Sequence, residues 1–110
     1  MAAKYFRKYA IPSATTETSL YEVPASNSAI VRSLRVTNTE ATSTNVTVNH
    51  YAAGSATAHV LQKTRSVGAI STFDVFAGVP CVMEAGDILK VISSGANVTF
   101  YLSYLELDRD

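Results

Sequence analysis

The sequence predicts an all-β protein, a single-domain antiparallel β-sandwich of jelly-roll-like architecture with about eight short strands. Segments rich in Val, Ile, Thr, Tyr and Phe recur along its 110 residues, and such side chains suit a pleated, half-buried surface. Turn-forming clusters separate these segments at intervals of about a dozen residues, a spacing typical of a sandwich or barrel. Apolar residues alternate with a period of two, and no amphipathic helical window of useful length occurs.

Gly, Pro, Asn, Asp and Ser mark the turns, because each favours a turn conformation for its own steric or hydrogen-bonding reason. Their clusters fall at residues 12–15, 24–27, 38–41, 53–55, 77–78, 85–87 and 93–97. The segments between the turns are the expected strands, at residues 4–11, 18–23, 29–38, 44–52, 57–65, 68–76, 80–84, 87–93 and 97–107. No internal repeat, charge run or linker divides them, so one domain is expected.

The alternation of apolar side chains predicts which face of a strand is buried. In the third segment, one face is expected to carry Ile30, Leu34 and Val36, and the other Val31, Ser33, Arg35 and Thr37. Val46 and Val48 share a face of the fourth segment. Near the C-terminus the shared face consists of Val98, Phe100, Leu102 and Tyr104.

The last segment is partly apolar on both faces, since its second face carries Thr99, Tyr101, Ser103, Leu105 and Leu107. A strand of this kind is normally covered on both sides, whereas a small sandwich covers only one. We therefore expect the second face to meet another chain or a long arm. The aromatic, basic stretch 5–9 is the candidate arm. The predicted division is an N-terminal arm with a candidate first strand (1–17) and a β-sandwich domain (18–110).

Nine basic and nine acidic residues give a formal net charge of +0. No global field therefore attracts nucleic acid or an anionic membrane, and neither is expected as a partner. Only 16% of the residues are charged, against about 25% in an average soluble domain. This low fraction favours a surface that is partly covered by a permanent protein partner.

The charge is divided between the two ends of the chain. The first ten residues are basic through Lys4, Arg7 and Lys8, and the last ten are acidic through Glu106, Asp108 and Asp110. Two interpretations stay open. Either both ends are solvated, or they pair within or between chains as neighbouring strands or arms.

No combination of residues typical of an enzyme is found, and no cofactor or metal ion is expected. Cys81 lies in an apolar run and is expected to be a small buried hydrophobe. His50 and His59 have no third ligand near them in sequence, so paired surface histidines on adjacent strands are favoured over a metal site. Asp87 follows a glycine at a strand start and is expected to cap a turn.

Neither a signal peptide nor a transmembrane segment is predicted. Three basic residues interrupt every apolar stretch near the N-terminus, and no long apolar run follows. We therefore expect synthesis and folding in a reducing cytoplasm, without disulfides.

Three stretches of the chain follow a recurring pattern of turns and strand starts. Tyr21–Ala25 with Ala29–Thr39 is similar to V-P-A … A-I-V-+-S-φ-x-V-x-N-T. Glu84–Val91 is similar to L-x-A-G-D-x-L-x-V, and Val98–Glu106 to V-x-V-x-V-S-x-x-E. In this pattern the chain resembles small virion proteins of tailed bacteriophages. The likeness covers residues 20–107 and rests on fold markers, namely turns and strand starts. The chain departs from the pattern at residues 4–11 and in its Tyr-rich last strand.

The resemblance implies a structural protein of the virion. We expect a capsid decoration (cement) protein, made in the host cytoplasm, that binds the capsid surface and stabilises the assembled shell. Its expected partners are the major capsid protein and further copies of itself. The alternatives are a tail, baseplate or fibre component and, from a different class, a carbohydrate-binding module for host adhesion. Aromatic and Arg side chains dominate binding hot spots, so the expected contact residues are Tyr5, Phe6, Arg7, Lys8, Tyr9, Tyr101 and Tyr104.

Overall fold

The computed structural model describes residues 3–11, 15–55, 57–76, 80–95 and 97–108. These residues form nine strands and no helix, which confirms the predicted all-β class. None of these residues therefore lies in a helix that could cross a membrane. The strands are β1 (Ala3–Ala10), β2 (Thr18–Glu22), β3 (Asn27–Asn38), β4 (Thr44–Tyr51), β5 (Ala58–Val67), β6 (Ser71–Asp74), β7 (Cys81–Met83), β8 (Ile88–Ser93) and β9 (Val98–Asp108).

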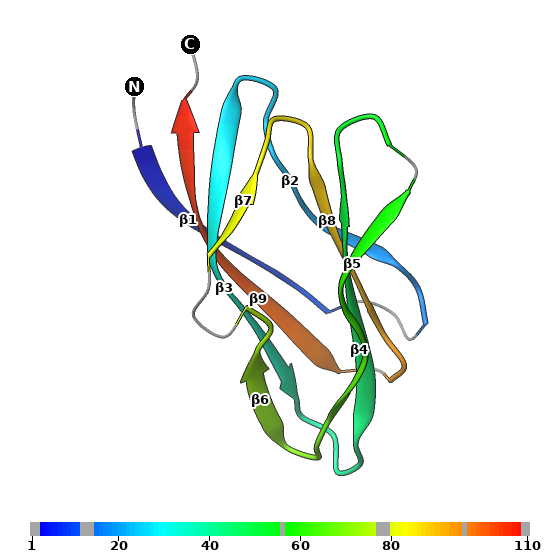
Figure 1. Cartoon of the computed structure of the whole chain (residues 1–110). Coiled ribbons are helices and arrows are strands. Elements are labelled where there is room, and N and C mark those ends of the chain that lie inside the picture. Colours follow the sequence, from blue (N-terminus) through cyan, green and yellow to red (C-terminus); the bar gives the residue numbers. More distant parts are fainter. Residues whose placement is uncertain (1–2, 12–14, 56, 77–79, 96, 109–110) are drawn as a thin grey trace.

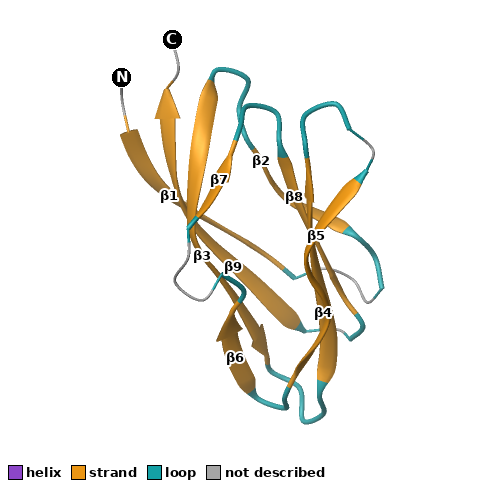
Figure 2. Cartoon of the chain, viewed as in Figure 1, coloured by secondary structure: helices purple, strands orange, loops and turns teal. Residues whose placement is uncertain are grey.

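The strands form two antiparallel sheets packed against each other (Figures 1 and 2). The first sheet has the order β1-β9-β3-β6, and β7 pairs with β3 along the same edge as β6. The second sheet has the order β2-β8-β4-β5. Strands from the start and the end of the chain are thus neighbours in both sheets. Successive strands from β1 to β4 alternate between the sheets, which gives a jelly-roll sandwich.

The core lies between the sheets and consists mainly of aliphatic side chains. The predicted inward residues of β4 and β9 are confirmed, because Val46, Val48, Phe100 and Leu102 are at most 1% exposed. Met83 from β7 is fully buried and belongs to the same core. Full burial of each such side chain stabilises the fold by about 1.5–3 kcal/mol.

The predicted faces of β3 are wrong in its first half. Val31, rather than Ile30, is buried, together with Leu34. The reason is a β-bulge at Arg32, where the register with β9 shifts between Val31 and Ser33. A bulge inserts one extra residue, so side chains on its two sides follow opposite phases of the alternation. Val31 and Leu34 therefore both point inward although they are three positions apart, an odd spacing, and Ile30 lies on the solvent side.

The two ends of the chain pair as neighbouring strands of one sheet. β1 runs antiparallel to β9 over eight residue pairs, and Lys4 lies opposite Glu106. Of the two interpretations of the charged ends, pairing within the chain is the observed one. The sequence suggested that the aromatic stretch 5–9 covers the second face of β9. The structure shows a different arrangement, in which this stretch lies beside β9 in the same sheet. It forms backbone hydrogen bonds along the edge of β9, because an extended strand satisfies its polar groups best in a ladder.

Candidate functional site

The solvent side of the first sheet carries an exposed row of apolar side chains. Tyr5 lies opposite Leu105, Leu105 opposite Ile30, and Ile30 opposite Val82. Residues directly opposite in an antiparallel ladder project from the same face. One apolar row therefore crosses β1, β9, β3 and β7. Tyr5 is 71% and Val82 66% exposed, and the two residues between them are half-buried.

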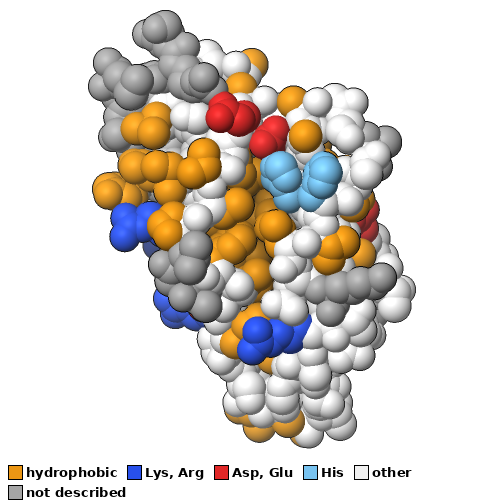
Figure 3. Space-filling model, viewed as in Figure 1, with side chains coloured by type: hydrophobic (Ala, Val, Ile, Leu, Met, Phe, Trp, Pro, Cys, Tyr) orange, Lys and Arg blue, Asp and Glu red, His pale blue; other side chains and the backbone are white. Residues whose placement is uncertain are grey.

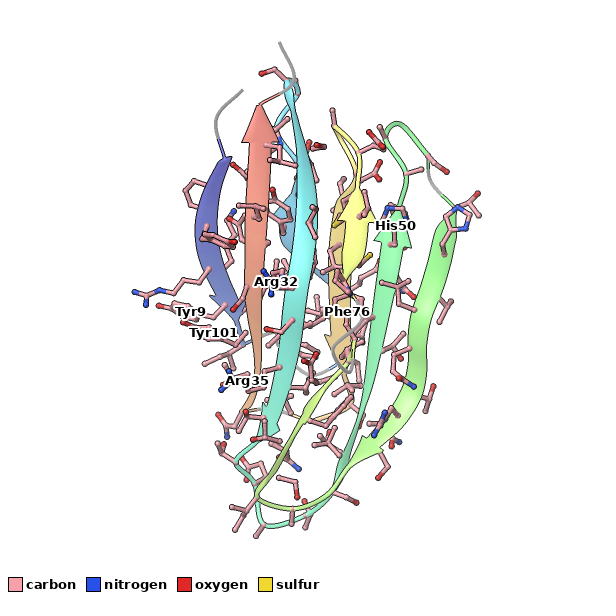
Figure 4. All side chains as sticks on the ribbon, turned by 60° about the vertical axis from the view of Figure 1, so that its left-hand side comes forward. Tyr9, Arg32, Arg35, His50, Phe76 and Tyr101 are labelled. Atoms are coloured by element: carbon pink, nitrogen blue, oxygen red, sulfur yellow. The ribbon has the colours of Figure 1, made fainter. Side chains whose placement is uncertain are left out.

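A second row crosses the same face nearer the other end of the strands. Tyr9 lies opposite Tyr101, Tyr101 opposite Arg35, and Arg35 opposite Asp74. Tyr9 is 69% exposed. Figure 4 shows Tyr9, Tyr101 and Arg35 near one another on β1, β9 and β3. This row combines two aromatic rings with a guanidinium group.

We call the two rows together with Arg7 and Arg32 the outer face. Arg7 lies on β1 between Tyr5 and Tyr9, and Arg32 is exposed at the bulge of β3. Figure 3 shows apolar side chains gathered at the upper left, where Figure 1 places β1, β9 and β7, with basic side chains below them. Exposed apolar patches rimmed by polar groups are typical of interaction sites.

The β1 strand is fixed to the sandwich from its inner side. The ring of Phe6 stacks on that of Tyr104, with 5.6 Å between their centroids. The Tyr104 ring in turn lies 4.2 Å from the centroid of Tyr21 in β2, and Lys8 Nζ lies 5.6 Å from that centroid. These contacts hold β1 in one orientation, so that Tyr5 and Tyr9 face solvent.

The expected contact residues therefore fall into three groups. Tyr5, Arg7, Tyr9 and Tyr101 share the outer face, whereas Phe6 and Lys8 point to the inner side but remain exposed at the sheet edge. Tyr104 is only 4% exposed and belongs to the core. Ile30, Arg35 and Val82 also lie on the outer face, although they were not among the expected contact residues. No sequence signal reveals the bulge in β3 that brings Ile30 to the outer face, and none pairs β7 with β3.

A polar cluster around Asp87 joins turns and strand ends of both sheets. Asp87 is 7% exposed, and its carboxylate accepts hydrogen bonds from the backbone N–H groups of Ala53 and Glu84 and from His50 Nε2, at 2.9–3.0 Å. Burial acts to raise the pKa of Asp87, but these hydrogen bonds outweigh it and hold the pKa below its ordinary value. The expected turn-capping role of Asp87 is confirmed.

The histidines lie on adjacent strands as expected, but His50 is half-buried and bonded to Asp87, and Cys81 is half-buried rather than fully buried. His50 and His59 are directly opposite on β4 and β5, with ring centroids 6.1 Å apart. Cys81 packs against the core, and burial, with a smaller contribution from Asp87, raises the pKa of its thiol. Within the described ranges, no group of three or more His, Cys, Asp or Glu residues could hold a metal ion.

The outer face offers binding rather than chemistry. It presents aromatic, aliphatic and guanidinium groups on a firmly paired sheet, and the aromatic and guanidinium groups are the ones that dominate protein–protein hot spots. Asp87 and His50 are occupied by hydrogen bonds that link turns, so their arrangement serves stability. The outer face is therefore the candidate functional site.

Comparison with known proteins shows the fold. No protein-family model matches the sequence, and no curated protein matches it either. Among solved structures, the chain is similar to a protein of Bacillus endospore appendages, described as disulfide-linked pili. The TM-score is 0.60 at 12% identity, over 99% of this chain and 88% of that one.

The chain is also similar to proteins of infectious bursal disease virus. One is from the T13 viral particle, with a TM-score of 0.57 at 9% identity, covering 94% of this chain and 30% of that one. Another is VP2 of the subviral particle, with a TM-score of 0.51 at 10% identity, covering 96% and 31%. This chain spans about a third of the length of those viral chains. At such identities the likeness shows a shared β-sandwich fold.

Proposed function

We propose that the protein is a structural component of a bacteriophage virion, a capsid decoration protein that attaches to the assembled shell through its outer face. The observation that carries this proposal is the pair of rows on one exposed sheet face, Tyr5–Leu105–Ile30–Val82 and Tyr9–Tyr101–Arg35. Both rows come from strands in a continuous ladder, so the surface is preorganised and binding orders few side chains.

The mechanism of such a protein is adhesive. A stable protein–protein contact buries about 1,600 Å² in total, and a sheet face that spans two shell subunits joins them. Each bridge adds its binding free energy to the shell, and attachment at many symmetry-related positions makes release slow. The phage assignment is supported by the sequence resemblance, and its structural class by the likeness of the fold to virus-particle proteins.

The direct test adds purified variants of the protein to virions produced without it and measures how many copies bind to the shell. Val82→Glu places a charge in the apolar row, and we expect it to reduce occupancy of the shell at least about tenfold, since a buried unpaired charge is costly. Val60→Glu is the matched control, because Val60 is also an exposed strand valine (52%) but lies in the second sheet. Equal occupancy by the two variants would overturn the proposal. Removal of residues 1–11 is unsuitable, because it would delete strand β1.

A tail or fibre component is the second candidate, favoured by the likeness to the Bacillus pilus protein over nearly the whole of both chains. A subunit of this kind would join its own copies end to end. Electron microscopy of the purified protein distinguishes the two: filaments support the fibre role, and discrete particles that bind shells support decoration.

Carbohydrate binding is favoured by a narrower observation, the adjacent rings of Tyr9 and Tyr101 beside Arg35. Tyrosine rings offer an apolar face together with a polar hydroxyl, which suits a sugar. A glycan array probed with the wild type and a Tyr9→Ser variant tests this role. Binding that depends on Tyr9 would support it.

A further inference from the structure

The free edges of the two sheets are not equivalent. In the second sheet, β2 has five residues and a register shift between Ser19 and Tyr21. β5 has two register shifts against β4, and Thr64 adopts a positive φ of 50°. The far edge of the first sheet is divided between β6 and β7, with four and three residues. Short and bulged strands of this kind discourage pairing with another chain.

β1 lacks these features. It pairs with β9 over eight successive residues without a register shift, and no described strand lies beyond it in the sheet (Figures 1 and 4). Its sequence, AKYFRKYA, contains neither Pro nor Gly. Every side chain from Tyr5 to Tyr9 is exposed. The edge thus presents an uninterrupted row of backbone N–H and C=O groups that another strand can pair with.

The charge of β1 decides which strand fits. Lys4, Arg7 and Lys8 give the strand three positive charges and no negative one. A second copy of β1 would bring two strands of three positive charges each side by side, and like charges on paired strands are destabilising. Lysine at an edge is a known means of preventing self-pairing. The existing neighbour already shows the complementary arrangement, since Lys4 lies opposite Glu106 of β9.

We propose that the free edge of β1 binds an extended acidic segment of the shell protein, which adds to the first sheet as a further strand. Backbone hydrogen bonds supply the attachment, and carboxylates opposite Arg7 and Lys8 supply the selectivity. The added strand would extend the sheet next to Tyr5 and Tyr9, so the edge and the outer face act on one partner. The inference rests on the proposed function for the identity of that partner.

The isolated full chain and synthetic peptides of the length of β1 test this edge. One labelled peptide carries two adjacent Glu residues flanked by Val, so that it can place a carboxylate opposite both Arg7 and Lys8, and a second peptide carries Lys in place of Glu. By fluorescence anisotropy, the Glu peptide should bind at least about tenfold more tightly and lose affinity as salt is added. A Glu peptide whose amides are N-methylated along both edges should not bind, because neither edge can then complete the ladder. Equal binding of the methylated peptide would show charge attraction alone and overturn the proposal.

Charge reversal gives a readout that unfolding cannot imitate. The double variant Arg7→Glu with Lys8→Glu should prefer the Lys peptide. The matched control, Arg65→Glu with Lys90→Glu, makes the same change in the second sheet, on β5 and β8, and should keep the original preference. Inversion by the control as well, or concentration-dependent dimers in which β1 amides resist hydrogen exchange, would overturn the proposal. If the peptides fail to bind but the protein binds shells normally, only this inference is rejected. If the peptides bind as expected but the protein does not bind shells, only the proposed function is rejected.

Discussion

The hydroxyl of Tyr21 donates a hydrogen bond to Glu106, with 2.5 Å between Tyr21 Oη and Glu106 Oε2. Tyr21 belongs to β2 in the second sheet and Glu106 to β9 in the first, so this bond joins the sheets near the chain ends. Asn27 Nδ2 donates to the other oxygen of the same carboxylate, at 3.3 Å. Tyr21 and Tyr104, on which Phe6 of β1 packs, are thus held in place by ring stacking and by the hydrogen bond to Glu106.

Replacement of Tyr21 by Phe should lower the free energy of unfolding by about 1–2 kcal/mol, because Tyr21 is buried and the change leaves a part-buried carboxylate oxygen without its donor. Denaturant unfolding followed by circular dichroism measures the loss. Tyr51→Phe is the control, since Tyr51 also donates to a carboxylate, Glu17, but in an exposed position. Its effect should be much smaller. An equal loss in both variants would contradict the interpretation.

Alkaline pH should destabilise the fold through the same tyrosine. Burial, with the hydrogen bond to Glu106 and its charge, raises the pKa of Tyr21 above the ordinary value of 10.0. Burial likewise raises the pKa of Tyr104. A folded-state pKa above the unfolded one contributes stability that is complete below pH 10 and is lost as the pH rises beyond it. The unfolding free energy of the wild type should therefore fall above about pH 10, and that of Tyr21→Phe should fall less steeply.

Strand positions and fold class were predictable from the sequence because they depend on local patterns. Every observed strand overlaps a predicted one, with bounds that differ by at most three residues. The alternation in β9 was also correct, because its pairs with β1 continue without a shift and Phe100 and Leu102 are buried. Turn residues and period-two patterns carry this information directly.

The outer face could be predicted only in part, because it depends on register. The bulge at Arg32 reverses the alternation in β3 and brings Ile30 to the solvent side. Val82 reaches the same row only because β7 pairs with β3, a contact between residues far apart in the sequence. A shift of one residue moves a side chain to the opposite face. Composition and spacing do not reveal such shifts.

Loss of the Asp87 carboxylate should destabilise the turns that it joins. Asp87→Asn removes one acceptor oxygen and places an NH₂ group near other donors, so we expect a loss of about 1–3 kcal/mol at neutral pH. Because the pKa of Asp87 is lowered, its contribution is present above the ordinary value of 3.8 and is lost as the pH falls through the folded-state pKa. The gap between wild type and variant should therefore narrow in acid. A constant gap from neutral pH to strong acid would exclude this role of the carboxylate.

Replacing Gly54 and Gly86 by Ala distinguishes two causes of lost stability, namely an unfavourable backbone conformation and a steric contact. Gly54 and Gly86 both have positive φ, +72° and +82°, where a side chain costs about 1–2 kcal/mol. A Cβ at position 54 would have no atom within 4 Å, whereas one at position 86 would lie 2.8 Å from the Cβ of Ala53. Gly86→Ala should therefore be more destabilising than Gly54→Ala in denaturant unfolding. In an Ala53→Gly background the difference should disappear, because the contacting atom is gone. A difference that persists there would show that the Ala53 contact is not its cause.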